Sequence, residues 1–303
     1  MDELDVAICR ILFQNSRTPY SDIAEEVDLT PQAVHRRVQA MTEMGIIGGT
    51  YAHLSFRGMG RMWVVVFGWS KAPNMNQLAQ RLRANHSMAL LQLASGNFVY
   101  IHGSIKDVNE LATFVSFVQK EAMLHEPQVG IVQTQPPARD EDFSLLDLKI
   151  VSALQGDARR SISELAEGLN TTPKTVKRRI NRLVKEELVS FSIKWKPDTE
   201  GDVVTQIHVT LREDMEREKA AFALIKKLAP GTMRTYHFSN LPKHMIVTYW
   251  SKTVRDMTAA CHELEAEGVF YSVVPNVMRG IHYFPEHMGR PLAESLARKQ
   301  RGK

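Results

Sequence analysis

The sequence predicts an α+β protein built by tandem duplication, in which a winged helix-turn-helix domain is followed by a ferredoxin-like βαββαβ domain and the pair then occurs again. Three observations predict this fold. The chain matches itself when it is shifted so that Leu4 falls on Leu146. Each matching segment has the pattern of three short helices and a strand region, and each is followed by strands and helices in the order βαββαβ. A period of this length is too long for a solenoid repeat, so whole domains are duplicated.

The internal repeat is strongest over residues 4–46. In these 43 ungapped positions, 13 residues are identical to their counterparts in the second copy, where chance would give roughly three. The identical pairs include Leu4-Asp5 with Leu146-Asp147, Thr30-Pro31 with Thr172-Pro173, and Arg36-Arg37 with Arg178-Arg179. The two halves therefore share one fold.

The first winged unit covers residues 1–57. Apolar periodicity predicts a helix over 4–14 and a second over 21–26. Thr30 is a good N-cap and Pro31 suits the first helical position, so a third helix begins here and ends before Gly45. Residues 46–56 then predict a short hairpin, with Gly48-Gly49 as its turn. The second winged unit, over residues 144–200, repeats this order with helices over 146–155, 163–168 and 173–186 and strands near 188–196.

An α/β unit follows each winged unit, over residues 60–135 and 202–285. The first is predicted to contain strand 61–70, helix 74–85, strands 88–94 and 97–105, helix 107–122 and strand 128–134. The second is predicted to contain strand 203–211, helix 214–228, strands 232–239 and 243–251, helix 253–266 and strand 269–277. Residues 136–143 are polar and proline-bearing, which predicts a linker, and residues 286–303 form a basic C-terminal tail.

Composition argues against several classes of protein. The 303 residues are 44% hydrophobic and 24% charged, which is typical of a globular protein. The longest apolar run, Met62 to Trp69, is too short to span a bilayer, and the N-terminus lacks the regions of a signal peptide. Cys9 and Cys261 lie in no motif, which argues against a disulfide scaffold or a zinc ribbon. We expect a cytoplasmic, nucleoid-associated protein with no membrane contact, no metal and no cofactor.

The net charge of +4 is not itself an argument for a nucleic-acid partner. Residues 290–303 carry five basic and one acidic side chain, so the rest of the chain sums to zero. Residues 1–60 carry five basic and eight acidic side chains. The prediction of DNA binding therefore depends on where charge lies on particular helices.

The third helix of each winged unit is the candidate DNA-reading element. Val34, Val38 and Met41 form the apolar stripe of the first copy, so polar side chains face outward. Arginine and lysine donate to guanine, and glutamine and asparagine pair with adenine, in the major groove. The residues predicted to contact DNA are Gln32, His35, Arg36, Arg37 and Gln39 in the first copy and Lys174, Lys177, Arg178, Arg179, Asn181 and Lys185 in the second. Arg37 lies about 60° from the stripe, which favours a phosphate contact. The alternative is a solvated helix face.

These segments resemble the helix-turn-helix signature of the Lrp/AsnC family, the feast/famine transcriptional regulators of bacteria and archaea. The resemblance is carried by Leu4-Asp5, Asp22-Ile23-Ala24, Leu29-Thr30-Pro31, Val34, Arg37-Val38, Met41 and Gly45-Ile46-Ile47, and in the second copy by Leu146-Asp147 through Leu188-Val189. It departs at Glu187, where the family has glycine. The resemblance implies a transcription factor that binds double-stranded DNA and forms homo-oligomers through its α/β domains, with a small amino-acid-like effector bound between them.

The resemblance also implies an effector site near the third strand of the α/β unit, where the family motif resembles Gly-Asp-Tyr-Asp. Here Gly96-Asn97-Phe98-Val99 keeps the glycine and lacks the final acid, so Gly96, Asn97 and Phe98 are the candidate ligand-binding residues. The second copy has Ser239-Asn240-Leu241-Pro242 and no glycine. The alternative for Gly96 is an ordinary hairpin turn.

The two candidate reading helices differ in charge. Residues 30–46 hold two basic and one acidic side chain, whereas residues 171–188 hold six basic and two acidic. Because non-specific affinity follows phosphate neutralisation, the second winged unit is expected to dominate affinity and its salt dependence. Two winged units with different third helices, which we call the two heads, predict an operator whose two half-sites differ in sequence.

Two other functions compete with the regulator. Siroheme decarboxylases resemble this tandem architecture, and the segment to compare is Arg234-Thr235-Tyr236-His237 with Lys243-His244, whose tyrosine and histidines could donate protons. A scaffold protein that has lost DNA binding is the third class. The retained Arg-Arg pairs favour the regulator, so no catalytic residues are assigned and the chain is not expected to be an enzyme.

Overall fold

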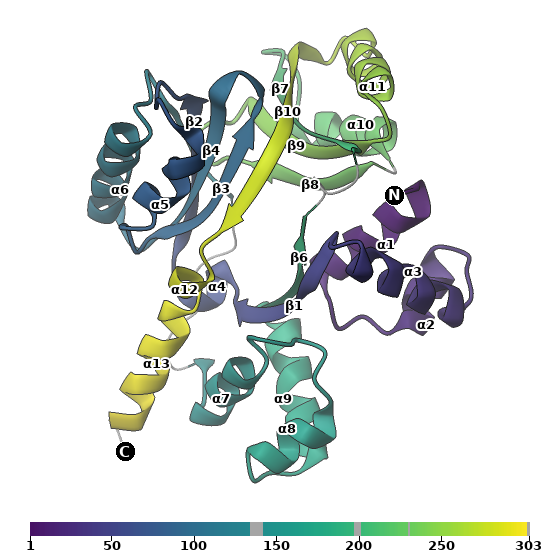
Figure 1. The fold of residues 1–303 in the computed structure, drawn as a ribbon, viewed down its shortest axis with the longest axis vertical. Helices are drawn as coiled ribbons and strands as arrows, with labels where there is room; N and C mark the ends of the chain where they lie inside the picture. The colour runs from purple at the N-terminus through teal and green to yellow at the C-terminus, as the bar shows by residue number, and fades with distance from the viewer. Residues whose placement is uncertain (134–141, 197–200, 230, 302–303) are drawn as a thin grey trace.

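The computed structural model describes residues 1–133, 142–196, 201–229 and 231–301. Two winged units and two α/β units are present, and Figure 1 shows the winged units below and beside a large sheet with helices on its outer sides. The structure is thus a mixed α+β fold. The linker predicted at 136–143 lies mostly outside the described residues.

The first winged unit contains α1 (Glu3–Gln14), α2 (Tyr20–Glu26), α3 (Pro31–Glu43) and β1 (Ile47–Leu54). Asp2 forms a capping box with Asp5 at the start of α1, and the Thr30 side chain accepts a hydrogen bond from the backbone of Ala33 at the start of α3. These caps satisfy backbone N–H groups that a helix leaves free at its first turn. The predicted helices of this unit are confirmed to within about two residues.

The second winged unit contains α7 (Leu145–Ala153), α8 (Ile162–Gly168), α9 (Pro173–Lys185) and β6 (Val189–Trp195). Ser144 and Ser161 form capping boxes with the third residue of α7 and of α8, and Thr172 caps α9. The order of elements is therefore the same as in the first winged unit.

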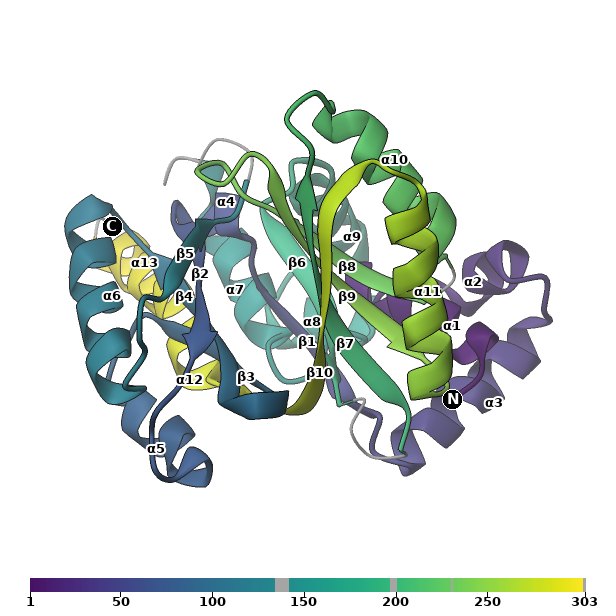
Figure 2. The same cartoon turned by 90° about the horizontal axis from the view of Figure 1, so that it is seen from above.

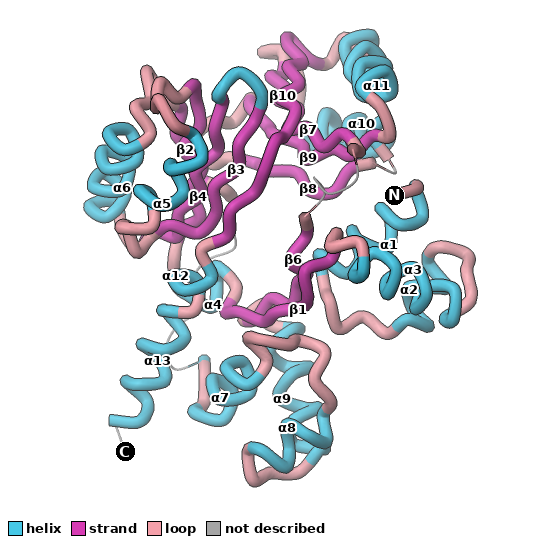
Figure 3. The backbone as a smooth tube through the Cα atoms, viewed as in Figure 1, coloured by secondary structure: helices cyan, strands magenta, loops and turns pink. Residues whose placement is uncertain are grey.

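The predicted hairpins at 46–56 and 188–196 are wrong. Each segment forms one strand, and the two strands pair with each other in an antiparallel two-stranded ribbon, β1 with β6 (Figure 3). Gly49 has φ +112° and lies where the register shifts between Ile47 and Thr50, so the glycine pair forms a bulge. The sequence prediction failed because the partner strand lies in the other half of the chain and not across a local turn.

The α/β units have the predicted order. After a short helix α4 (Phe56–Met59), the first contains β2 (Met62–Trp69), α5 (Leu78–Leu82), β3 (Met88–Ala94), β4 (Phe98–Ile105), α6 (Val108–Glu121) and β5 (Gln128–Ile131). The second contains β7 (Val203–Leu211), α10 (Arg217–Leu228), β8 (Thr232–His237), β9 (His244–Ser251), α11 (Val254–Ala266) and β10 (Phe270–Tyr283). Short 3₁₀ turns precede α5 and β4.

The two α/β units share one eight-stranded sheet, in the order β5-β2-β4-β3-β10-β7-β9-β8. The long strand β10 joins the halves, since its first part pairs with β7 and its last part with β3. The two end strands also meet, through an isolated bridge between Val132 and Phe238. The inner face therefore encloses a core drawn from both units, which includes Phe67, Tyr100 and Tyr236.

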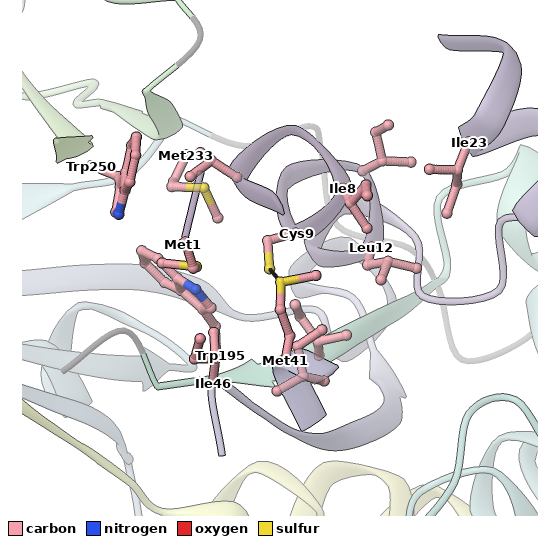
Figure 4. Close-up of a cluster of buried hydrophobic side chains, with 14 of the residues drawn as sticks. Met1, Ile8, Cys9, Leu12, Ile23, Met41, Ile46, Trp195, Met233 and Trp250 are labelled. Carbon is pink, nitrogen blue, oxygen red and sulfur yellow. Dashed lines mark hydrogen bonds between the residues drawn. The ribbon is translucent and has the colours of Figure 1, made fainter. Parts of the chain in front are cut away.

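Helices α5 and α6 cover the outer face of the first half of the sheet, and α10 and α11 that of the second (Figure 2). The core of the first winged unit is completed by residues of the second half of the chain. Figure 4 shows Trp195, Met233 and Trp250 beside Met1 and Cys9 in this cluster. The two halves of the chain are therefore interlocked.

Residues 286–303, predicted to be a basic tail, are mostly helical where the structure describes them. They form α12 (Pro285–Met288) and α13 (Arg290–Arg301). Leu292 and Leu296 of α13 pack into the core of the second winged unit, while Phe284, just before α12, is buried in the first α/β unit. The amphipathic pattern of α13 has a buried face because its packing partner is the distant helix α7.

Candidate functional site

Helix α9 presents a basic outer face. Val176, Ile180 and Leu183 are buried and pack the helix against the core of the second winged unit. The predicted contact residues Lys174, Lys177, Arg178, Asn181 and Lys185 are all exposed. None of the four cations in this set forms an ion pair with a described residue. Their charge is therefore available to phosphate groups.

Helix α3 presents a weaker version of this face. Gln32, His35, Arg36 and Gln39 are exposed, and Arg36 is the one cation of the set without an ion-pair partner among the described residues. Gln39 donates to Glu43 at 3.0 Å, and the ring of His35 packs edge-on against Tyr20 at 5.6 Å. The structure thus keeps the difference between the two helices that their sequences show.

The other two predicted contacts, Arg37 and Arg179, are bound within their own units. Arg37 donates to Asp2 at 2.8 Å and to Asp5 at 2.7 Å. These hydrogen bonds raise the pKa of Arg37, and the bond to Asp5 has the larger effect. Arg179 donates to Asp147 at 3.3 Å. In both copies this arginine therefore connects the third helix to the capping box of the first helix. This structural role alone accounts for the presence of the arginine in both copies. A phosphate contact by either residue stays a prediction.

The two winged units are held together by reciprocal contacts. Arg17 donates to the carbonyl of Arg160 at 3.0 Å, and Arg159 donates to that of Ser16 at 2.8 Å and that of Thr18 at 3.3 Å. Arg159 is the counterpart of Arg17 in the second copy, so each unit grips the other through the same residue. Together with the ribbon, these contacts fix α3 and α9 relative to each other.

The candidate effector residues lie in the turn between β3 and β4. Gly96 and Asn97 are exposed and have φ of 65° and 57°, a left-handed conformation that suits glycine and asparagine. Phe98 is buried in the shared core, where the exposed ring of Trp69 packs edge-on against it at 4.9 Å. Effector binding at this turn stays a prediction.

The matching turn of the second α/β unit is used to join the two units. The side-chain amide of Asn240 donates to the carbonyl of Val129 and its oxygen accepts from the N–H of Ile131, both at 2.7 Å. This side chain thus pairs with strand β5 much as a further strand would, next to the bridge between Val132 and Phe238. Its polar groups are occupied by the fold.

A central cavity lies between the ribbon and the inner face of the sheet. Its volume is about 220 Å³, and it is open to solvent on one side. Its lining residues come from both winged units, both α/β units and the segment around α12, and they include Phe13, Tyr51, Trp63, Trp195, Arg234 and Tyr283. The sequence did not predict this cavity.

A chain of buried polar groups runs along one wall of the central cavity, with His102 behind that wall. Trp63 Nε1 donates to His102 Nδ1 at 3.1 Å, so His102 Nε2 carries the proton and donates to Gln92 Oε1 at 3.0 Å. Gln206 Nε2 donates to the same oxygen at 3.3 Å, and Thr248 donates to Gln206 at 3.0 Å. Burial, with a smaller effect from the cation of Arg234, lowers the pKa of His102 to about 3, so this histidine is neutral.

Arg234 is the central cation of the cavity. Its guanidinium lies 5.1 Å from the ring centre of Tyr236 and 5.8 Å from that of Phe13. It forms no hydrogen bond or ion pair with any described residue. The lining contains no aspartate or glutamate among the residues that the structure describes. The cavity is therefore electropositive and contains several aromatic side chains.

The remaining residues of the segment compared with decarboxylases lie elsewhere. Arg234 and Tyr236 line the cavity, whereas His237, Lys243 and His244 do not. Lys243 donates to three backbone carbonyls, that of Glu213 at 2.8 Å, and His244 lies 3.1 Å from His208 within the shared core. The structure thus brings together only part of this set.

Sequence reasoning missed Gln92 and Gln206, and a signal for them exists. Each is a single amide in a largely apolar strand run, Met88–Ala94 and Val203–Leu211. A buried polar side chain of this kind needs a partner, which a network or a ligand supplies. Within the described ranges, no group of three or more histidine, cysteine, aspartate or glutamate side chains could hold a metal ion, and no helix could span a membrane.

Known families match both winged units. Residues 1–42 match the AsnC-type helix-turn-helix domain, and residues 143–190 match a winged helix-turn-helix DNA-binding domain. The HTH-type transcriptional regulator LrpA of Pyrococcus horikoshii is 30% identical over 118 residues, which cover 38% of this chain and 84% of that protein. The regulatory protein AsnC of Haemophilus influenzae is 38% identical over 60 residues, 20% of this chain and 40% of that protein.

Among solved structures, the siroheme decarboxylase NirDL has a similar fold over the whole chain. The TM-score is 0.58 with 15% identity, over 99% of this chain and 100% of that one. A co-complex of NirDL with an iron-uroporphyrin III analogue gives a TM-score of 0.56 over 98% and 99% of the two chains. At this identity the likeness concerns the fold, whereas the sequence matches concern the family. This chain belongs to the Lrp/AsnC family of helix-turn-helix transcriptional regulators.

Proposed function

We propose that this chain is a sequence-specific, double-stranded DNA-binding regulator in which the second winged unit supplies most of the affinity. The observation that carries this proposal is the outer face of α9, with four exposed cations that have no ion-pair partner among the described residues. Helix α3 offers one such cation, Arg36. The winged helix-turn-helix matches and the LrpA and AsnC relatives support DNA as the partner. A protein of this kind acts at the nucleoid, in the cytoplasm.

The affinity of a random-sequence duplex tests this proposal. The double variant Lys177→Ala/Arg178→Ala is expected to weaken binding about 10-fold or more at low salt, because two phosphate contacts are lost. The control Lys120→Ala/Arg255→Ala removes the same charge from the exposed outer faces of α6 and α11 and is expected to change affinity less than about twofold. Equal effects of the two double variants would reject α9 as the DNA-binding element.

A single chain would supply both heads of an operator complex. The tandem duplication, with winged units at 1–57 and 144–200 and α/β units at 60–135 and 202–285, is supported by the matching order of elements and by the reciprocal arginines. We expect selected duplexes to contain unlike half-sites. Recovery of a perfect palindrome would contradict this. Association of whole chains through the α/β units belongs to the same proposal, and analytical ultracentrifugation measures it.

A second candidate function is that of an enzyme similar to siroheme decarboxylase. The observation that favours it is the electropositive central cavity in a fold that resembles NirDL over its full length. Tyr236 lines this cavity and carries a phenol that can donate a proton. Incubation with siroheme followed by absorbance spectroscopy tests this function. A shifted porphyrin spectrum and loss of carboxyl groups would establish it, and an unchanged spectrum would remove it.

A further inference from the structure

The central cavity has the composition of a binding site for an organic anion. Among its described lining residues, Lys194 and Arg234 are cationic and none is acidic. Neither cation has an ion-pair partner in the described part of the chain. A cation that is partly removed from water is stabilised by an opposite charge, and the protein supplies none here. The missing partner is therefore expected from a ligand.

The walls of the cavity indicate that the anion is flat and aromatic. The ring centres of Phe56 and Trp63 lie 4.3 Å apart at one side of the cavity, and Trp195 and Tyr236 also line it. Aromatic rings bind flat rings by offset stacking and edge contacts. Gln92 adds a directed polar group, because its oxygen accepts two hydrogen bonds while its Nε2 has no partner among the described residues. An N–H donor and a guanidinium together suit a carboxylate.

The same cavity touches both winged units. Its walls include Tyr51 and His53 of β1, Lys194 of β6 and Phe13 of α1. β1 and α1 belong to the first winged unit, whereas β6 belongs to the second and pairs with β1 in the ribbon. Gln155, which follows α7, adds another contact from the second winged unit. A ligand that binds one arrangement of these elements better than another must shift the population toward it.

We infer that the central cavity binds a flat aromatic carboxylate through Arg234 and Lys194, and that this ligand changes the DNA affinity of the winged units. The second clause rests on the proposed function as a DNA-binding regulator. The cavity is distinct from the turn at Gly96, Asn97 and Phe98, since none of these three residues lines it. The cavity thus provides an effector site between the ribbon and the sheet.

Calorimetry on the full chain with 2-naphthoate and the uncharged 2-naphthamide tests the site. We expect one 2-naphthoate per chain, and Arg234→Gln should weaken it about 10-fold while leaving 2-naphthamide within about twofold. Lys194→Gln provides an independent variant with the same expected selectivity. Arg255→Gln, on the exposed face of α11, is the matched control and should change neither ligand. No binding to the unsubstituted chain, or equal binding to the Arg234→Gln variant, would overturn the site.

The coupling is tested by fluorescence anisotropy with a labelled random-sequence duplex. Saturating 2-naphthoate should change DNA affinity by about threefold or more, and DNA should change 2-naphthoate affinity by the same factor. The Arg234→Gln variant should lose this coupling. If the duplex binds equally with and without 2-naphthoate, the coupling is overturned and the regulator proposal stands. If no duplex binds, the proposed function fails, and calorimetry still decides whether the cavity is a site.

Discussion

At the scale of single residues, one repeated arginine has a structural role that the sequence alone did not separate from DNA binding. Arg37 and Arg179 both point to the capping box of the first helix of their unit. The sequence identified them because they recur at the same place in both copies and lie beside outward-facing residues. Their partners Asp5 and Asp147 recur as well, and this second pair of identities was the available signal. Residues that are identical in the two copies can therefore indicate a structural role as well as a functional one.

Asp5 and Asp147, the third helical residues of the two capping boxes, differ in burial. Replacing them is therefore expected to lower the free energy of unfolding by different amounts. Asp147 is fully buried and accepts from Arg182 at 2.9 Å as well as from Arg179, whereas 14% of the Asp5 side chain is exposed. We expect Asp147→Ala to lower the free energy of unfolding by about 3 kcal/mol, because a buried charge network and a cap are lost. Asp5→Ala should cost about 1 kcal/mol. Urea unfolding of both variants measures this, and equal losses would contradict it.

The buried His102 predicts a pH dependence of stability. Its pKa in the folded chain is about 3, against about 6.5 in an unfolded chain. Below about pH 6.5 the unfolded state binds a proton that the folded state does not, so stability present at neutral pH is lost as the pH falls toward 3. Each such histidine contributes about 1.4 kcal/mol per pH unit within that window.

The variant His102→Gln is expected to reduce this slope by about 1.4 kcal/mol per pH unit between about pH 6 and pH 4, since an amide keeps a donor and an acceptor without titrating. Urea unfolding at several pH values measures the slope. His262→Gln, on the exposed face of α11, serves as the control and should leave it unchanged. The same slope in the His102→Gln variant and in the parent chain would contradict the assignment.

At the scale of elements, the sequence predicted what local patterns determine. Helices α3 and α9 begin at threonine-proline pairs, which cap them locally. The βαββαβ order of both α/β units likewise follows from turns and periodicity within a few residues. The ribbon of β1 and β6, the packing of α13 on α7 and the central cavity depend on partners far away in the chain. Local patterns do not contain those partners, so hairpins and a tail were predicted instead.

The bulge in β1 gives a direct test of the ribbon. Gly49 has φ +112° and open space around it, so Gly49→Ala would add backbone strain without a clash. We expect this change to lower the free energy of unfolding by about 1–2 kcal/mol. Gly48, whose added methyl group would meet only ordinary contacts of 3.4 Å or more, is the control and should lose less. A Gly49→Ala variant as stable as the Gly48→Ala variant would show that this bulge is absent in solution.

At the scale of the whole molecule, one chain contains the paired arrangement of two similar halves. The ribbon, the reciprocal arginines and the continuous sheet connect two unlike third helices within one chain. The central cavity touches both halves. The chain is therefore a paired arrangement of two winged units, and we propose that the second supplies most of the phosphate contacts.

The salt dependence of DNA binding tests this central claim most directly, because equivalent positions can be compared within one chain. Lys177 and Arg178 occupy the positions in the second copy that His35 and Arg36 occupy in the first. With log affinity plotted against log salt for one duplex, Lys177→Ala/Arg178→Ala should reduce the magnitude of the slope by about 2, and His35→Ala/Arg36→Ala by about 1 or less. A loss of slope at the first winged unit that equals or exceeds the loss at the second would contradict the account.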